Sequence, residues 1–257
     1  MAFVQLEDGE MHYQIDGPAD APVLVLSNSL GTDLRIWDRV VSALGDQFRV
    51  LRYDKRGHGL SEVTAPPYTL ADHRDDLIAL IEHLALTQVI LCGLSVGGMI
   101  AQELALRHPK RVDKLILGAT QAGGKRATRT PLSVITRYAR SARLTPSERN
   151  RNTAKLVLSP GTVEARPEIL AAWDSHLTED PISTKTIFKQ ALAARRHDTW
   201  ARLPEIGAQT LVVTGDADTL MPPINSNVLA SRIPGAKLVL VPGAAHDLTT
   251  DRPEESA

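Results

Sequence analysis

The chain has 257 residues, 43% hydrophobic and 23% charged, which is enough for one α/β domain or for a core with a small lid. Its formal net charge of −1 favours neither a nucleic-acid partner nor a membrane surface. A single cysteine, Cys92, excludes an internal disulfide framework, and no apolar run approaches the ~18 residues of a membrane span. No basic stretch followed by an apolar one stands at the N-terminus, so we expect no signal peptide and a cytoplasmic location.

Short runs rich in Val, Ile and Leu alternate with longer helical patterns through most of the chain. Asp8-Gly9 separates the first two runs and predicts a hairpin. The later runs are almost continuously apolar, which is typical of parallel strands covered on both faces. We predict strands at 3–6, 11–15, 23–26, 49–53, 89–92, 114–117, 210–214 and 237–241, and helices at 33–44, 70–84, 96–107 and 225–233.

The segment from 121 to 205 interrupts this alternation. It has no obvious strand, and its prolines divide it into short helical stretches. It carries 15 Lys and Arg against 8 Asp and Glu, a net +7, whereas the remainder carries 14 against 22, a net −8. We interpret 121–205 as a helical lid inserted into a core made of 1–120 and 206–257. The alternative is a solvated helical face that happens to be basic.

The motif Gly93-Leu94-Ser95-Val96-Gly97 lies between a predicted strand and a predicted helix. Glycines permit a sharp, strained turn that lifts a side chain above the end of the strand. The helix that follows directs its N-terminus, which favours negative charge, at the same point. We therefore predict Ser95 as a nucleophile; the alternative is an ordinary glycine-rich turn.

A serine hydroxyl needs a base, and the base needs an acid that orients it. In the α/β-hydrolase fold, which the Gly-x-Ser-x-Gly turn resembles, the acid and then the base follow later strands. His246 is the last of eight histidines and follows the final predicted strand, so it is the predicted base. Asp216 and Asp218 both follow the preceding strand, and either could be the acid.

Taken together, the motif around Ser95 and the alternating pattern resemble the α/β-hydrolase fold. The resemblance implies a mostly parallel eight-stranded sheet with a helical lid insertion. In that fold the acid stands in a G-x-x-D stretch followed by proline, which Gly215-x-x-Asp218 and Met221-Pro-Pro resemble. The resemblance therefore selects Asp218 over Asp216.

An oxyanion hole needs two backbone N–H groups directed at the charge that develops on the substrate oxygen. Val96, directly after the predicted nucleophile, is expected to supply one. The second should come from the loop after the strand at 23–26, where most relatives have His-Gly. This chain has Asn28-Ser29 there, so Leu30 is predicted to supply the second N–H.

Two stretches resemble the bacterial 3-oxoadipate enol-lactonases, which open a small anionic enol-lactone during aromatic-acid breakdown. These are Ser27-Asn-Ser-Leu-Gly-Thr-Asp with Trp37, and Arg52-Tyr-Asp-Lys-Arg-Gly-His-Gly-Leu-Ser. The resemblance covers residues 1 to about 120 and, as motifs, about 207 to 250. It implies that Asn28 and Trp37 contact substrate. The chain departs from that family after His246, where Asp-Leu-Thr replaces Leu-Ser-Asn, and 143–200 contains no diagnostic motif.

We predict a serine hydrolase that cleaves a small lactone or ester through an acyl-enzyme, with 3-oxoadipate enol-lactone as the implied substrate. Alternatives are a general carboxylesterase, thioesterase or perhydrolase, a slow ligand receptor with the same triad, and an inactive scaffold. No metal, organic cofactor, nucleic acid or membrane partner is predicted, and the oligomeric state is left open. An anionic substrate needs a buried cationic partner. The candidates are Arg137, Arg140, Arg143, Arg195 and Arg196, with Arg137 and Arg140 the predicted contacts.

Overall fold

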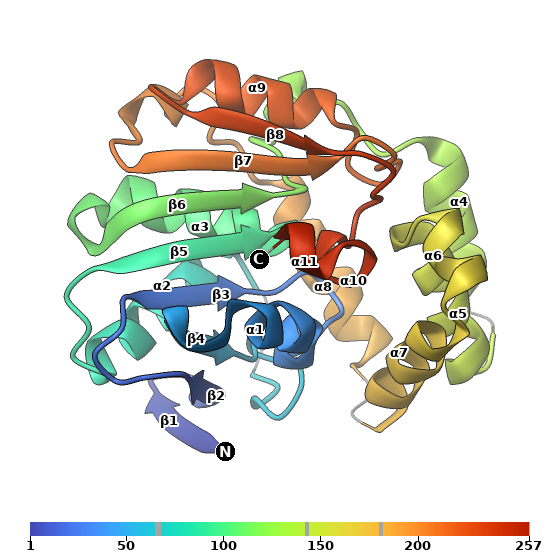
Figure 1. Ribbon diagram of the computed structural model, residues 1–257, viewed down its shortest axis with the longest axis horizontal. Coiled ribbons are helices and arrows are strands. Elements are labelled where there is room, and N and C mark those ends of the chain that lie inside the picture. The colour runs from blue at the N-terminus through green and yellow to red at the C-terminus, as the bar shows by residue number, and fades with distance from the viewer. Residues whose placement is uncertain (65–67, 142–143, 180–181, 257) are drawn as a thin grey trace.

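A mixed sheet forms the middle layer of the molecule (Figure 1). The computed structural model describes residues 1–64, 68–141, 144–179 and 182–256. Within these ranges the sheet has eight strands in the order β1-β2-β4-β3-β5-β6-β7-β8. The strands are β1 (Ala2–Leu6), β2 (Gly9–Asp16), β3 (Val23–Ser27), β4 (Arg49–Tyr53), β5 (Val89–Leu94), β6 (Val112–Gly118), β7 (Gln209–Gly215) and β8 (Lys237–Val241).

The parallel part of the sheet runs from β4 to β8, whereas the β1–β2 and β2–β4 pairs are antiparallel. All eight predicted strands are present, each within two residues of its predicted bounds at either end. The predicted fold class, a mostly parallel eight-stranded α/β-hydrolase sheet, is confirmed. Because parallel strands share one direction, the loops after β3, β5, β7 and β8 all leave the same edge of the sheet.

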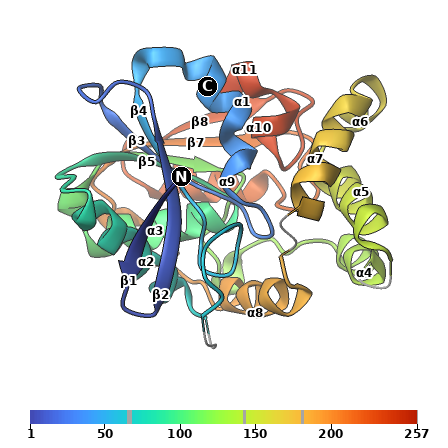
Figure 2. The same cartoon turned by 90° about the horizontal axis from the view of Figure 1, so that it is seen from below.

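Helices cover both faces of this sheet (Figure 2). One face carries α2 (Leu70–His83), α3 (Val96–Arg107) and α9 (Ile224–Arg232), packed over a large apolar cluster that includes Leu77, Leu104 and Leu229. The other face carries α1 (Asp38–Leu44), α10 (Leu248–Asp251) and α11 (Pro253–Ser256), over a smaller cluster that includes Val40 and Leu248. The short 3₁₀ helices are η1 (Leu34–Trp37), η2 (Gly45–Gln47), η3 (Pro109–Arg111), η4 (Gly124–Arg126) and η5 (Leu203–Glu205).

The helix predicted at 33–44 is split into η1 and α1. Asp33 has an extended backbone and its side chain accepts a hydrogen bond from the Arg35 amide. This cap favours a tight first turn, and Trp37 then joins η1 to α1. No helix in the described ranges is long and apolar enough to cross a membrane.

The segment between β6 and β7 forms a helical insertion (residues 121–205). Its helices are α4 (Leu132–Ser141), α5 (Pro146–Val157), α6 (Pro160–Ala165), α7 (Pro167–Glu179) and α8 (Thr184–Arg195). Prolines begin α5, α6 and α7, where a missing N–H costs no helical hydrogen bond. Helices α4 to α7 lie beyond the carboxyl ends of β5 to β8, and α5 to α7 share a small apolar cluster of their own (Figure 1). The role of the insertion as a lid stays a prediction.

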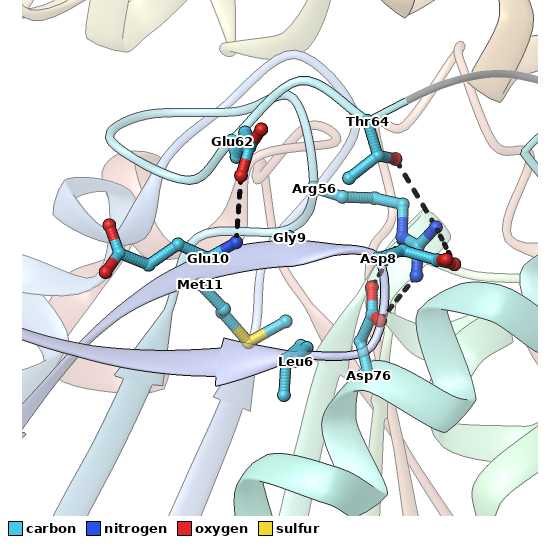
Figure 3. Close-up of a pocket in the computed structure, with 9 residues that line it drawn as sticks. All are labelled: Leu6, Asp8, Gly9, Glu10, Met11, Arg56, Glu62, Thr64 and Asp76. Atoms are coloured by element: carbon cyan, nitrogen blue, oxygen red, sulfur yellow. Dashed lines mark hydrogen bonds and ion pairs between the residues drawn. The ribbon is translucent and has the colours of Figure 1, made fainter.

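A buried ion pair joins the loop after β4 to α2, beside the turn between β1 and β2 (Figure 3). Arg56 donates through Nε and Nη2 to the two carboxylate oxygens of Asp76, at 2.6 and 2.5 Å. The two side chains are only 10% and 8% exposed. The Arg56 carbonyl also accepts from Gln190 of α8. The pair therefore connects the hairpin side of the sheet to α2 and to the insertion.

We expect Asp76→Ala to destabilise the fold by up to about 3–5 kcal/mol, because among the described carboxylates it leaves the buried Arg56 charge with only the long 3.4 Å contact to the exposed Asp8 carboxylate. The matched control is Asp75→Ala on the same helix. Asp75 is 59% exposed and pairs with Arg74, so its removal should cost less than about 1 kcal/mol. Urea unfolding followed by circular dichroism measures both. Equal losses in the two variants would contradict a structural role for the buried pair.

Candidate active site

Ser95 lies on a strained turn between β5 and α3. Its φ and ψ are 55° and −115°, a conformation that residues with a Cβ seldom adopt. The neighbouring glycines are required by close backbone packing. A Cβ on Gly93 would lie 2.3 Å from the Gly97 carbonyl oxygen, and one on Gly97 would lie 2.0 Å from the Ser27 carbonyl oxygen. The turn is thus as sharp as the motif predicts.

Hydrogen bonds to β6 and to the loop that follows it hold this turn in place. The Ser95 amide donates to the Gly118 carbonyl at 2.8 Å. The Ser95 carbonyl accepts from the Thr120 hydroxyl at 2.6 Å. Strain of this kind, of order 1–3 kcal/mol, persists only where the surroundings over-determine the conformation. The backbone of Ser95 is therefore fixed while its hydroxyl stands at the carboxyl edge of the sheet.

His246 and Asp218 form a buried pair at the same edge. The His246 Nδ1 lies 2.8 Å from Asp218 Oδ2, and each residue is 3% exposed. The other carboxylate oxygen accepts from the amides of Leu220 and Met221, so Asp218 is fixed in orientation. With Nδ1–H donated to the carboxylate, Nε2 is the free basic atom, and it is buried without a partner among the described residues. This is the atom that a hydroxyl nucleophile would need.

The structure places Asp218, not Asp216, against His246. Asp216 is exposed and accepts from the Gly243 amide at 2.7 Å. It braces the loop before His246 and does not reach the imidazole. Spacing alone left both Asp216 and Asp218 open as partners of the histidine, and the geometry pairs His246 with Asp218.

Three influences act on the pKa of His246. Burial lowers it, because the imidazolium loses its hydration. The charge and hydrogen bond of Asp218 raise it, and the charge of Asp247 raises it further, so that the pKa lies above its ordinary value. Because a base must be deprotonated to act, the form of His246 that the predicted role requires accumulates only as the pH rises through this elevated pKa.

The loop after β3 carries Leu30, the second predicted oxyanion donor. Hydrogen bonds with the segment after β4 hold this loop in place. Lys55 donates from Nζ to the carbonyls of Asn28 and Ser29, at 2.9 and 2.8 Å. The Gly31 amide donates to His58 Nε2 at 3.1 Å. On the other side of the expected hole, α3 begins at Val96, whose amide belongs to the first helical turn and has no acceptor within the helix.

Of the four predicted substrate contacts, Asn28 and Trp37 are buried. The Asn28 amide nitrogen donates to the Thr32 carbonyl at 2.8 Å and so braces its own loop. Trp37 packs in the smaller apolar cluster, and its indole nitrogen has no partner in the described structure. Arg137 and Arg140 are exposed on α4. Contact of all four with substrate stays a prediction.

Of the three other candidate arginines in the insertion, the structure describes two. Arg195 and Arg196 are exposed at the end of α8. Arg143 lies outside the described residues. Over the part of the chain that the structure describes, no group of three or more His, Cys, Asp and Glu side chains is arranged to hold a metal ion.

Sequence reasoning missed two buried carboxylates beyond His246. Asp251 accepts hydrogen bonds from the amides of Ser159, at the start of α6, and Ala245, beside the base. Asp247 caps α10 through its Oδ1, while its Oδ2 is buried without a partner in the described structure. Burial raises the pKa of Asp247, against hydrogen bonds from Thr249 and Thr250 that lower it. The signal available in the sequence was the replacement of Leu by Asp directly after the histidine.

Comparison with known proteins places this geometry among hydrolases. The family model of the alpha/beta hydrolase fold matches residues 22–253. The chain is 30% identical to a 3-oxoadipate enol-lactonase of Acinetobacter baylyi over 250 residues, which are 96% of this chain and 90% of that protein. It is 31% identical to a proline iminopeptidase of Pestalotiopsis fici over 268 aligned positions, which cover 97% of this chain and 94% of that protein. It is also similar to the crystal structure of the enol-lactonase from Burkholderia xenovorans, with 31% identity, a TM-score of 0.88, and coverage of 99% and 96%.

We expect Asp218→Asn to lower the pKa of His246 below its ordinary value. The substitution removes the carboxylate charge, so that burial, which disfavours the imidazolium, outweighs the remaining charge of Asp247. Asp216→Asn is the matched control and should leave the pKa unchanged. Titration of the imidazole resonances by NMR measures both. The opposite ranking would assign the orienting role to Asp216.

Proposed function

Because the chain belongs to the alpha/beta hydrolase fold family, we propose that it is a serine hydrolase that cleaves a small lactone or ester through an acyl-enzyme. The observation that carries this proposal is the buried His246–Asp218 pair, whose free Nε2 lies at the sheet edge where the strained turn presents Ser95. A nucleophile, a base and an orienting acid are the minimum for acyl transfer. All three come from loops that leave one edge of the sheet.

In the proposed reaction the Ser95 oxygen attacks the carbonyl carbon and His246 Nε2 takes the hydroxyl proton. Asp218 holds the imidazole and stabilises the imidazolium that forms. The negative oxygen of the tetrahedral intermediate accepts hydrogen bonds from the amides of Val96 and Leu30. Collapse expels the alkoxide or enolate, which takes the proton from His246, and water then hydrolyses the acyl-enzyme with the same base.

For the substrate we propose a small enol-lactone of the kind that the A. baylyi relative's name describes. The relative and the B. xenovorans structure, 30% and 31% identical over nearly the whole chain, support this choice. The net +7 of the helical insertion also favours approach of an anion. The Asn-Ser-Leu-Gly loop, which Lys55 and His58 hold in place, is the feature of the site that resembles the enol-lactonases.

A neutral ester or lactone is the second candidate, and a specific observation favours it. The buried Asp247 carboxylate acts electrostatically on His246, and its Oδ2 is unpartnered in the described structure. A second anion bound close by would be repelled in this poorly hydrated region. The insertion arginines that the structure describes as exposed, Arg137, Arg140, Arg195 and Arg196, do not offset that charge inside the protein.

Replacement of the nucleophile tests the reaction class. Ser95→Ala should lower kcat by about 10⁴-fold or more, because the triad acts as a unit. It should also abolish the mass increase that a fluorophosphonate produces on the wild-type protein. Ser226→Ala, which removes a similarly buried hydroxyl on α9, is the control and should behave as wild type. Retention of more than about a tenth of the activity in Ser95→Ala would refute the proposed mechanism.

Substrate charge separates the two candidates. If the enol-lactone proposal holds, kcat/KM should be higher for an anionic lactone than for its neutral methyl ester, and added salt should reduce the difference by screening. Asp247→Asn should increase the ratio further, because it removes the opposing charge. The ratio of two substrates on one protein cancels any effect of that substitution on His246. Preference for the neutral ester would exclude the enol-lactone and leave the second candidate.

A further inference from the structure

Lys55 is a buried lysine whose ammonium contacts the loop that carries Leu30. It is 1% exposed, and its ammonium donates to two successive backbone carbonyls, those of Asn28 and Ser29. No carboxylate oxygen forms an ion pair with it anywhere in the described structure. Burial of a lysine charge without such a partner is costly. The two carbonyls do not by themselves require a charged partner, because a neutral amide donor could satisfy them.

The contact of Lys55 with the Ser29 carbonyl lets its charge act on the neighbouring Leu30 N–H. The Ser29 carbonyl and the Leu30 N–H belong to one rigid, planar peptide group. A hydrogen bond to the oxygen of a peptide group polarises that group, so its N–H becomes a stronger donor on the opposite side. The ammonium of Lys55 thus both fixes the direction of the Leu30 N–H and increases its positive character.

The rest of the loop is held by neighbouring residues of the same segment after β4. His58 accepts from the Gly31 amide, and Asp54 Oδ1 accepts from the Leu34 amide at 2.8 Å. These contacts fix the far side of the loop. The Ser29 carbonyl accepts a second hydrogen bond, from the Thr32 hydroxyl at 3.0 Å, and Lys55 is the described side chain that donates to both carbonyls preceding Leu30. Thr32 is a neutral donor, so removal of Lys55 should take away the charge on the Leu30 peptide and its contact with Asn28 while the remainder of the loop stays anchored.

We propose that Lys55 is a positioning residue for the oxyanion hole, which orients and polarises the Ser29–Leu30 peptide toward the transition state. This inference rests on the proposed function. Lys55 does not contact the reacting atoms, and it acts only through that peptide. Its effect should appear where negative charge develops on the substrate oxygen, and not in the binding of the uncharged ground state.

The surroundings of Lys55 make its charge sensitive to pH. Burial lowers the pKa of Lys55 to about 7, although Asp54 and Asp33 act in the opposite direction. The other titratable groups that act on this site are His58 and His73, and burial lowers the pKa of each, so both are neutral at working pH. Because the charged form is the protonated one, polarisation of the peptide is complete below this pKa and declines as the pH rises through it.

The first test compares Lys55→Met with wild type on a neutral aryl ester. Removal of a whole oxyanion donor costs about 10²–10³ in kcat, so a misdirected and weakened donor should cost about 10- to 100-fold. KM should stay within about threefold. Affinity for a phenylboronic acid, whose serine adduct carries a tetrahedral anionic group, should fall by a factor similar to that in kcat. Lys110→Met, at an exposed lysine in the turn before β6, is the control and should match wild type.

The second test uses Lys55→Arg and the pH profile of kcat. Wild type should lose activity as the pH rises through the pKa of Lys55, and this decline is superimposed on the rise that deprotonation of His246 produces. Arginine keeps its charge, so Lys55→Arg should retain activity without this alkaline decline. Should this larger side chain fail to fold, Lys55→Gln provides the measurement, with partial activity and no alkaline decline.

Two results would overturn the inference. One is kcat and boronate affinity in folded Lys55→Met within twofold of wild type, and the other is a loss confined to KM. An alkaline decline that persists in Lys55→Arg or Lys55→Gln would overturn the role of the charge. Ser95→Ala, measured alongside, separates these failures from failure of the proposed function. If Ser95→Ala abolishes turnover while Lys55→Met equals wild type, only the inference on Lys55 is refuted; if Ser95→Ala stays active, the proposed function itself fails.

Discussion

The contact between Gly97 and the Ser27 carbonyl is the constraint on which the site depends. A Cβ on Gly97 would lie 2.0 Å from that oxygen, so only glycine lets the first turn of α3 approach the end of β3. This approach brings together the two segments that carry Val96 and Leu30. The turn that makes this approach passes through the positive φ at Ser95. One close packing contact is therefore associated both with the strained backbone of Ser95, the proposed nucleophile, and with the expected oxyanion hole.

The order of the strands determines which segments hold the loop after β3. In the sheet, β3 lies between β4 and β5. The loop after β3 is thus flanked by the Ser95 turn on one side and by the segment from Asp54 to His58 on the other. Three polar side chains of that segment each hold a different part of the loop. Asp54 accepts from Leu34, Lys55 donates to the loop carbonyls, and His58 accepts from Gly31. The segment from Asp54 to His58 therefore serves the geometry of the site.

The central sheet was predictable because its strands are short apolar runs ended by turn residues, and burial on both faces makes that pattern unambiguous. Ser95 and His246 followed from their positions directly after such runs, whereas Asp218 needed a resemblance to separate it from Asp216. The helices of the insertion were not assigned individually, because they are short, charged and divided by prolines. Lys55 and Asp251 were missed for a different reason. A charged side chain is ordinarily expected at the surface, and only the tertiary structure shows which carbonyls and amides it satisfies.

Under the proposed function, charge near His246 and charge on the insertion act on a substrate at different stages. The arginines described on α4 and α8 are exposed, so their field extends into solvent and changes the rate at which an anion approaches. Asp218, Asp247 and Asp251 are buried around the loop of His246, where a low dielectric strengthens their effect on a bound anion. Asp251 also accepts from both Ser159 and Ala245, so α6 and the base loop are joined through one carboxylate. For an anionic substrate the insertion therefore favours encounter while the buried carboxylates oppose binding, and the balance between them determines which candidate substrate the site prefers.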